Sequence, residues 1–552
     1  MKKYMTVEML AATLITALWL AVAAEARVIG IQITSIESPT FAGRSFGTVG
    51  QYEKLIGTAT LEVNPNDPHN SNITDVNLAP KTPSGKVRWS TDILILKPVD
   101  MSRGNHKIFF EVNNRGNLLA LGFAFNEAKT GGNNPGSAAS DAGNGFLFEQ
   151  GYTLIWAGWE GDVLPGNSRL IDRVPVGKNP DGSSITGKLR QEYSDVASGT
   201  YTLPLSGSPA FVSYESVTAD NTQALLTVRT HDSDPKVSVP SNQWAFGTCP
   251  TGQSSLVPNT TNFCYFPGFS PDKLYELSWT AKNPLVMGLA FPVTRDVPSF
   301  FRYSAKDDSN NPNPLAGAIT RAYVWGASQS GAYIRDWLYQ GYNEDEQGRK
   351  VFDAAWADIG AAVRTFANVR FLQENDYSRQ DQWHDYLQNA IFPFQWAVTT
   401  DPITGRTDGI LKRPATDPYV FATNHGEEYR WGQNSLTYIS GDGKKPLQIP
   451  HNVREYDYSS MPHGSSYPSP VSRGICKNFI NQGPGIKALN RALLVALDDW
   501  VTKGIEPPQS RLASLGQLIQ PDKFCAQFPT IPGLTCTNLV NELTTLDFGP
   551  EF

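Results

Sequence analysis

Ser328 is the residue of this sequence with the clearest chemical context. It lies in the segment Gly326-Ala327-Ser328-Gln329-Ser330-Gly331, between an apolar run that predicts a strand and a segment that predicts a helix. A sharp strand-to-helix turn presents a nucleophilic serine, and the side chains two places before and after it crowd each other. Gly326 and Ser330 are small enough, so the segment predicts a nucleophile elbow.

Ser330 offers a second hydroxyl in the same turn. A turn centred on Ser330 would have Ser328 and Ala332 as its small flanks. We prefer Ser328 because it lies closer to the end of the predicted strand and has a glycine two places before it. Ser330 also replaces the last glycine of the common G-x-S-x-G pattern, which makes it a candidate residue of the substrate pocket.

Backbone N–H groups next to the elbow are candidates for an oxyanion hole. The N–H of Gln329 is expected to face the developing negative charge, and the helix dipole adds to its effect. A second donor comes from the loop after an earlier strand. The loop Asn113-Asn114-Arg115-Gly116 has that place in chain order, so Arg115 or Gly116 is expected to supply it.

A serine hydroxyl is a weak nucleophile and needs a general base. His463 is favoured among the seven histidines because it follows the last predicted core strand, where the order serine, acid, histidine would place it. His425 and His451 lie on nearby loops and are rivals. The remaining histidines lie outside the expected position: His69, His106, His231 and His384.

The base in turn needs a carboxylate that orients it. Glu427 and Glu428 follow the predicted strand 419–422, and Asp358 follows the strand before it. All three would emerge at carboxyl ends of strands, where open α/β sheets bind ligands. The spacing alone does not choose among them.

Short apolar runs separated by helical segments must position these residues. They predict an α/β fold with a mostly parallel central sheet. The core strands are expected at 107–112, 151–157, 322–325, 354–357, 419–422 and 453–456, with a helix over 332–339 after the serine. Runs this short and apolar are typical of strands buried on both faces.

The N-terminal part of the chain differs from the rest. Residues 27–105 are rich in Thr, Ile, Val and Pro and predict a β region that leads into the main sheet, with strands near 28–33, 59–63 and 87–96. The catalytic domain is expected to comprise residues 106–552.

Two long stretches inside that domain do not fit the alternation and are interpreted as insertions. Residues 163–275 are rich in Pro, Gly, Ser, Thr and Asn, with strand-like pieces such as 224–229. Residues 366–415 are rich in aromatic side chains. We interpret the second as a cap over the site, which favours a bulky or apolar acyl or alcohol group in the substrate.

The first 26 residues predict a signal peptide. Lys2 and Lys3 precede an apolar stretch over 9–24, and Ala24-Glu25-Ala26 fits a cleavage site after Ala26. The alternative is an uncleaved membrane anchor. No other segment is apolar enough to span a bilayer, so a secreted or periplasmic protein is expected.

Five cysteines are consistent with that location. The simplest local disulfides are Cys249 with Cys264 and Cys525 with Cys536, which would leave Cys476 as a free thiol. Neither metal-binding cysteine spacing nor a phosphate- or dinucleotide-binding glycine motif is present. We therefore expect no metal and no cofactor. The net charge of −7 and the lack of a basic patch argue against a nucleic-acid partner.

Several motifs in order resemble those of large bacterial α/β-hydrolase-domain proteins. They are the Ser328 segment, 158–162, 341–345, 348–353, Glu428-Tyr429, 453–456 and His463-Gly464. The resemblance implies a triad of Ser328, Glu428 and His463. It also places Trp159 and Asp162 near the site, where they would either contact the substrate or serve packing.

The expected activity is hydrolysis of a small-molecule or lipid-like carboxylic ester. An acyltransferase or lactonase with the same triad, a peptidase or amidase, and a non-catalytic binding protein on the same scaffold are the alternatives. The sequence carries no signal for an oligomeric state.

Overall fold

The structure is a computed structural model. It describes residues 27–231, 234–365, 367–371, 391–459, 461–464, 486–519, 523–533 and 535–536. The predicted signal peptide and Cys476 lie outside the described residues.

The core of the described chain is an 11-stranded sheet in the order β1-β3-β4-β6-β5-β15-β16-β19-β20, with β2 beside β3 and β7 beside β4. Six neighbouring strands run parallel to one another: β6 (Thr153–Ala157), β5 (Lys107–Glu111), β15 (Arg321–Ala327), β16 (Ala354–Asp358), β19 (Tyr419–His425) and β20 (Val453–Tyr458). The α/β class and the mostly parallel sheet are therefore confirmed, and each predicted core strand overlaps one of the six.

The N-terminal β region continues this sheet with antiparallel strands. They are β1 (Arg27–Glu37), β2 (Ser45–Phe46), β3 (Gly50–Val63) and β4 (Val87–Pro98). The short β7 (Asp172–Arg173) comes from the start of the predicted first insertion and pairs with β4, so these residues belong to the main sheet. Strand β4 pairs with β6, which joins the extension to the parallel part.

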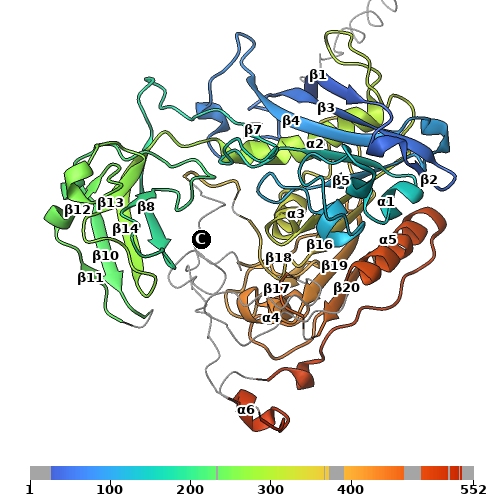
Figure 1. Cartoon of the computed structure of the whole chain (residues 1–552). Coiled ribbons are helices and arrows are strands. Elements are labelled where there is room, and N and C mark those ends of the chain that lie inside the picture. The colour runs from blue at the N-terminus through green and yellow to red at the C-terminus, as the bar shows by residue number, and fades with distance from the viewer. Residues whose placement is uncertain are drawn as a thin grey trace, which may run out of the picture.

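Helices cover both faces of the sheet (Figure 1). Side chains alternate along each strand, so Ile108 and Phe110 share one hydrophobic cluster with α2 (Ala290–Tyr303) and α3 (Gln329–Gln340). Phe109, between them, belongs to the cluster on the other face, with α5 (Ile486–Lys503). Shorter helices are α1 (Phe146–Glu149), α4 (Glu428–Trp431) and α6 (Phe524–Gln527).

Residues of the first insertion form a lobe of their own, drawn in green in Figure 1. One sheet has the order β11 (Val237–Ser238), β10 (Leu225–Arg229), β14 (Leu274–Lys282) and β8 (Thr186–Tyr193). A second has the order β12 (Trp244–Phe246), β13 (Asn262–Tyr265) and β9 (Thr202–Pro204). A separate hydrophobic cluster lies between these strands. The lobe extends beyond the predicted boundary at residue 275, because its strand β14 ends at Lys282.

The second insertion is described only in part. The ring centroid of Phe371 lies 5.4 Å from that of Tyr214, so the start of this segment packs against the first insertion. Farther on, β17 (Thr399–Thr400) and β18 (Thr407–Asp408) form a hairpin. Residues 372–390, with several of the aromatics, lie outside the described residues, so the cap remains a prediction.

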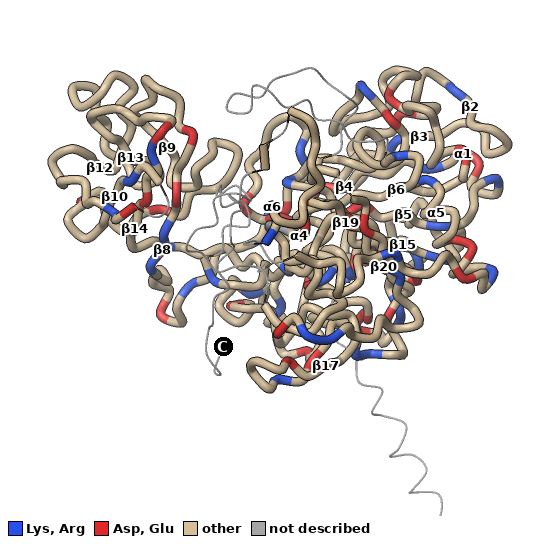
Figure 2. The backbone as a smooth tube through the Cα atoms, turned by 90° about the horizontal axis from the view of Figure 1, so that it is seen from below, with Lys and Arg blue, Asp and Glu red and all other residues tan. Residues whose placement is uncertain are grey.

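Both predicted local disulfides are present, Cys249 with Cys264 and Cys525 with Cys536. Acidic and basic residues are interspersed along the chain (Figure 2). Among the described residues, no helix is both long and apolar enough to cross a membrane.

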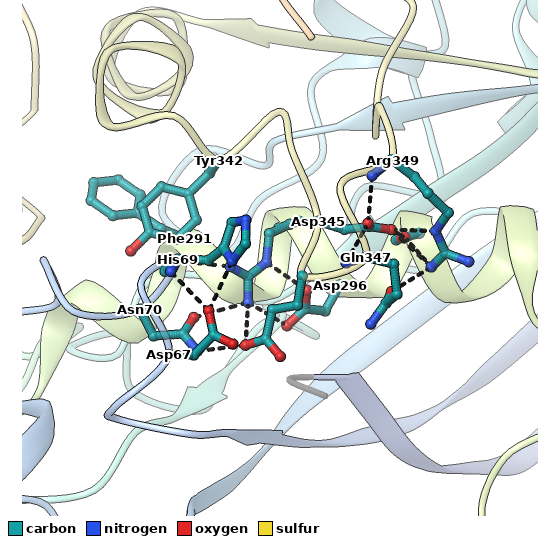
Figure 3. A network of polar contacts seen from close by, with 12 residues as sticks. Asp67, His69, Asn70, Phe291, Asp296, Tyr342, Asp345, Gln347 and Arg349 are labelled. Carbon is teal, nitrogen blue, oxygen red and sulfur yellow. Dashed lines mark hydrogen bonds and ion pairs between the residues drawn. The ribbon is translucent and has the colours of Figure 1, made fainter. Parts of the chain in front are cut away.

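A buried polar network fastens α2 to two loops (Figure 3). The guanidinium of Arg295 is fully buried and contacts the carboxylates of Asp296 at 2.7 Å and Glu346 at 3.6 Å. It also donates to the side-chain oxygen of Asn70. The network therefore joins the loop between β3 and β4 to the loop after α3.

Candidate active site

Ser328 lies at a sharp turn between β15 and α3. Its φ of 63° and ψ of −125° are unusual for a residue with a side chain, and strain of this kind gathers at functional sites. A Cβ on Gly326 would lie 2.9 Å from the Cβ of Ser330, and one on Gly331 would lie 2.4 Å from the carbonyl oxygen of Asp358. The small residues around the serine are thus required by the turn.

The structure brings Ser328, His463 and Glu428 together. The Ser328 Oγ lies 2.7 Å from Nε2 of His463, and Nδ1 of that ring lies 2.5 Å from Oε1 of Glu428. The Glu428 side chain is fully buried, whereas the His463 side chain keeps 18% of its surface exposed. A ring held at Nδ1 by a carboxylate carries its proton there, so Nε2 is the nitrogen that accepts the serine proton.

The other two candidate acids contact different groups. Glu427 Oε2 accepts the backbone N–H of His463 at 2.6 Å. Asp358 Oδ1 accepts the hydroxyl of Thr423 at 2.6 Å, and burial raises the pKa of Asp358 to about 6. Among the three, Glu428 is the carboxylate against the His463 ring.

The rival histidines have other surroundings. His425 is buried, and its Nδ1 lies 2.8 Å from the carbonyl oxygen of Pro462. His451 precedes β20 and so lies at the edge of the sheet opposite Ser328. His106 precedes β5 at that same edge, His69 and His231 pair with nearby aspartates, and His384 lies outside the described residues.

The loop after β5 lies beside the elbow. Asn114 and Asn117 exchange two backbone hydrogen bonds of 2.9 Å, and the two residues between them, Arg115 and Gly116, have φ of 53° and 74°. The Asn114 side chain donates to the carbonyl oxygen of Ala327 at 3.2 Å. Among the described residues, the N–H groups of Arg115 and Gly116 have no acceptor.

Ser330 and Trp159 both hold this loop. The Ser330 hydroxyl is buried and donates to the carbonyl oxygen of Asn113 at 2.9 Å, and Trp159 Nε1 donates to the same oxygen at 2.7 Å. The Trp159 ring packs against Tyr333, with 4.1 Å between centroids. Asp162 is buried too, and its carbonyl accepts the N–H of Val212. The sequence places Asn113 in the candidate oxyanion loop but does not predict that its carbonyl accepts hydrogen bonds from both Ser330 and Trp159.

A family model described as an alpha/beta hydrolase domain matches residues 251–524. These residues include the whole serine–histidine–glutamate constellation and four of the six parallel strands. The chain therefore contains an α/β-hydrolase domain.

Two solved structures are similar to this chain, both described as a glucuronoyl esterase from Solibacter usitatus. Each is 10% identical, and the match covers 79% of this chain. It covers 84% and 85% of those chains, with TM-scores of 0.26 and 0.24. None of the curated proteins matches the chain significantly in sequence. Within the described residues, no group of three or more His, Cys, Asp or Glu side chains is placed to hold a metal ion.

Proposed function

We propose that the protein is an exported serine hydrolase that cleaves carboxylic esters through Ser328, His463 and Glu428. The observation that carries this proposal is the continuous chain of contacts from the serine hydroxyl through the imidazole to a buried carboxylate. That arrangement is the one that activates serine in acyl transfer on several unrelated folds.

In the first step Ser328 Oγ attacks the ester carbonyl carbon. Its proton passes to Nε2 of His463, and the charge of the resulting imidazolium is balanced by Glu428. The carbonyl oxygen becomes an oxyanion, which the N–H of Gln329 and one N–H of the Arg115-Gly116 turn stabilise. When the carbon–oxygen bond to the alcohol breaks, His463 gives its proton to the leaving alkoxide, and an acyl group remains on Ser328.

The second step reverses these roles with water. His463 removes a proton from the water as its oxygen attacks the acyl carbon, and a second oxyanion forms in the same place. The bond between the acyl carbon and Ser328 Oγ then breaks, the carboxylic acid leaves, and Oγ takes the proton back from His463. No atom of the protein is consumed.

Export is the second part of the proposal. It rests on the predicted signal peptide and gains support from the two disulfides, because such bonds persist in oxidising compartments. N-terminal sequencing of the protein recovered outside the cytoplasm should give Arg27 as the first residue. A first residue of Met1 would contradict cleavage.

The activity is tested with p-nitrophenyl esters of increasing acyl length and with a fluorophosphonate, whose adduct is mapped by mass spectrometry. Wild type should hydrolyse at least one ester and carry the label on Ser328. Cleavage of anilides at a similar rate would indicate an amidase, and transfer to an added alcohol in preference to water would indicate an acyltransferase. If the wild-type protein showed no turnover and took up no label, the result would indicate a non-catalytic protein.

A further inference from the structure

We propose that His425 is a positioning residue that holds the base His463 and the acid Glu428 in the correct relative position. This inference rests on the proposed function, because it concerns how His463 and Glu428 are kept in place. In the sequence His425 looks like a rival base, but its contacts give it a different task.

The imidazole of His425 holds the loop that carries His463. Its Nδ1 lies 2.8 Å from the carbonyl oxygen of Pro462, the residue directly before the base. A carbonyl oxygen only accepts hydrogen bonds, so Nδ1 carries the proton and donates. The ring is fully buried, and loss of a buried donor leaves the carbonyl without its partner, which costs more than loss of an exposed hydrogen bond.

The backbone of the same residue holds the acid. The N–H of His425 donates to Oε2 of Glu428 at 2.5 Å, while Oε1 of that carboxylate faces Nδ1 of His463. His425, at the end of β19, therefore contacts both the loop that carries His463 and the carboxylate of Glu428 that orients the His463 ring.

A third contact completes the attachment. Glu427 Oε2 accepts the N–H of His463, so the chain from His425 to Glu428 holds the Pro462-His463 loop at three points. The alternative is a buried histidine that merely fills space. That alternative predicts a change in stability without a specific effect on turnover.

Other titratable groups lie near the His425 ring, and a substitution at His425 should not displace them. Its ring centroid lies 5.8 Å from that of Tyr458, and the buried Asp358 carboxyl interacts with it electrostatically. Among the described residues, Nε2 of His425 has no hydrogen-bond partner. The bond from Nδ1 to Pro462 is thus the side-chain hydrogen bond that a substitution removes.

Two variants of matched chemistry separate positioning from packing. In His425→Asn the amide nitrogen occupies nearly the place of Nδ1, so it can still donate to Pro462. In His425→Gln the same amide lies one carbon farther out and misses that place. His425→Leu removes the donor altogether. Circular dichroism and thermal melting identify the variants that fold.

The readouts are kcat and KM for the best p-nitrophenyl ester and the rate of fluorophosphonate labelling. We expect His425→Leu and His425→Gln to lower kcat and the labelling rate on the order of 10- to 100-fold, as small misplacements of catalytic groups do, with KM within about twofold. His425→Asn should recover most of the loss. If His425→Leu does not fold, the comparison of Asn with Gln decides.

Equal losses in the Asn and Gln variants, or full activity in both, would overturn the inference while wild-type turnover leaves the proposed function intact. Wild type without turnover or label would overturn the proposed function, and this inference with it.

Discussion

The Oγ of Ser328 lies 2.7 Å from Nε2 of His463, although 135 positions separate the two residues in the sequence. They follow strands that are not neighbours, because β16 and β19 lie between β15 and β20. The loop after β20 must therefore return across the carboxyl ends of two strands to reach the serine. That loop is supported by contacts with His425, the last residue of β19, and with Glu427 and Glu428, which follow this strand.

Substitution of the two serines of the elbow should have unequal effects. Ser328→Ala should abolish fluorophosphonate labelling and reduce kcat by at least about 10³-fold, because the proposed nucleophile is lost. Ser330→Ala should retain the label and stay within about tenfold of wild type, since it removes one of two donors to the Asn113 carbonyl. Loss of label only in Ser330→Ala would refute Ser328 as the nucleophile.

The two adjacent glutamates should also differ. Glu428→Gln leaves an amide against Nδ1 of His463 and favours the wrong tautomer, so kcat should fall on the order of 10³- to 10⁴-fold. Glu427→Gln still offers an oxygen to the backbone N–H of His463, so its loss should not exceed about tenfold. Steady-state kinetics on the best ester measure both, and the reverse ranking would assign the acid to Glu427.

Much of the core was predictable because buried parallel strands are short, apolar and separated by helices. The serine elbow was predictable because its small residues are required by close contacts at Gly326 and Gly331. The choice between Glu427 and Glu428 was not predictable from spacing, because neighbouring side chains at the start of α4 point to different atoms of one histidine.

Side-chain direction also limited the interpretation of other residues. Spacing made His425 a rival base, but which way its ring faces depends on the Pro462 loop, which arrives from 37 positions away. Trp159 was expected near the pocket from resemblance alone, and its bond to Asn113 depends on how two loops meet. The sequence did not predict that β14 continues to Lys282, because alternating apolar residues are a weaker strand signal than a continuous apolar run.

Trp159→Phe tests whether the loop after β5 supports turnover. The phenyl ring can still pack against Tyr333, but the donor to the Asn113 carbonyl is lost. We expect kcat to fall by about 3- to 10-fold with little change in KM, because one hydrogen bond to the loop of the proposed oxyanion hole is removed. Ser330→Ala with Trp159→Phe should cost more than either alone. An unchanged kcat in the double variant would show that this carbonyl does not position the loop.

The two disulfides should contribute unequally to stability. Replacing Cys249 and Cys264 with alanine opens a 15-residue loop that joins β13 to the end of β12, which should destabilise the inserted lobe by about 3 kcal/mol. Calorimetry and limited proteolysis should show earlier unfolding and cleavage between residues 186 and 282. The matched control replaces Cys525 and Cys536, which lie in a largely exposed segment, and should leave the main transition unchanged. Equal shifts of that transition in both double variants would contradict a lobe-specific effect.

The buried network around Arg295 should make stability depend on pH. Burial raises the pKa of Glu346 to about 8, and that of Asp296 is raised as well, with a single buried guanidinium between them. Between the unfolded value of 4.5 and about 8, the folded protein therefore binds a proton at Glu346 that the unfolded chain has lost. The free energy of unfolding should then decrease as the pH rises through this window, by at most about 1.4 kcal/mol for each unit of pKa difference.

Glu346→Gln isolates that contribution. The amide keeps an oxygen for the side chain of Asn70, which donates to Glu346 at 2.5 Å, and it does not titrate. Urea unfolding at intervals from pH 5 to about 8.5 should give a smaller loss of stability with rising pH than in wild type. Glu506→Gln is the matched control, because the Glu506 side chain is 67% exposed and should keep the wild-type slope. If the Glu346→Gln variant kept the wild-type slope as well, the Glu346 carboxyl of the wild-type protein would be ionised over the whole pH range. It would then form a full ion pair with Arg295.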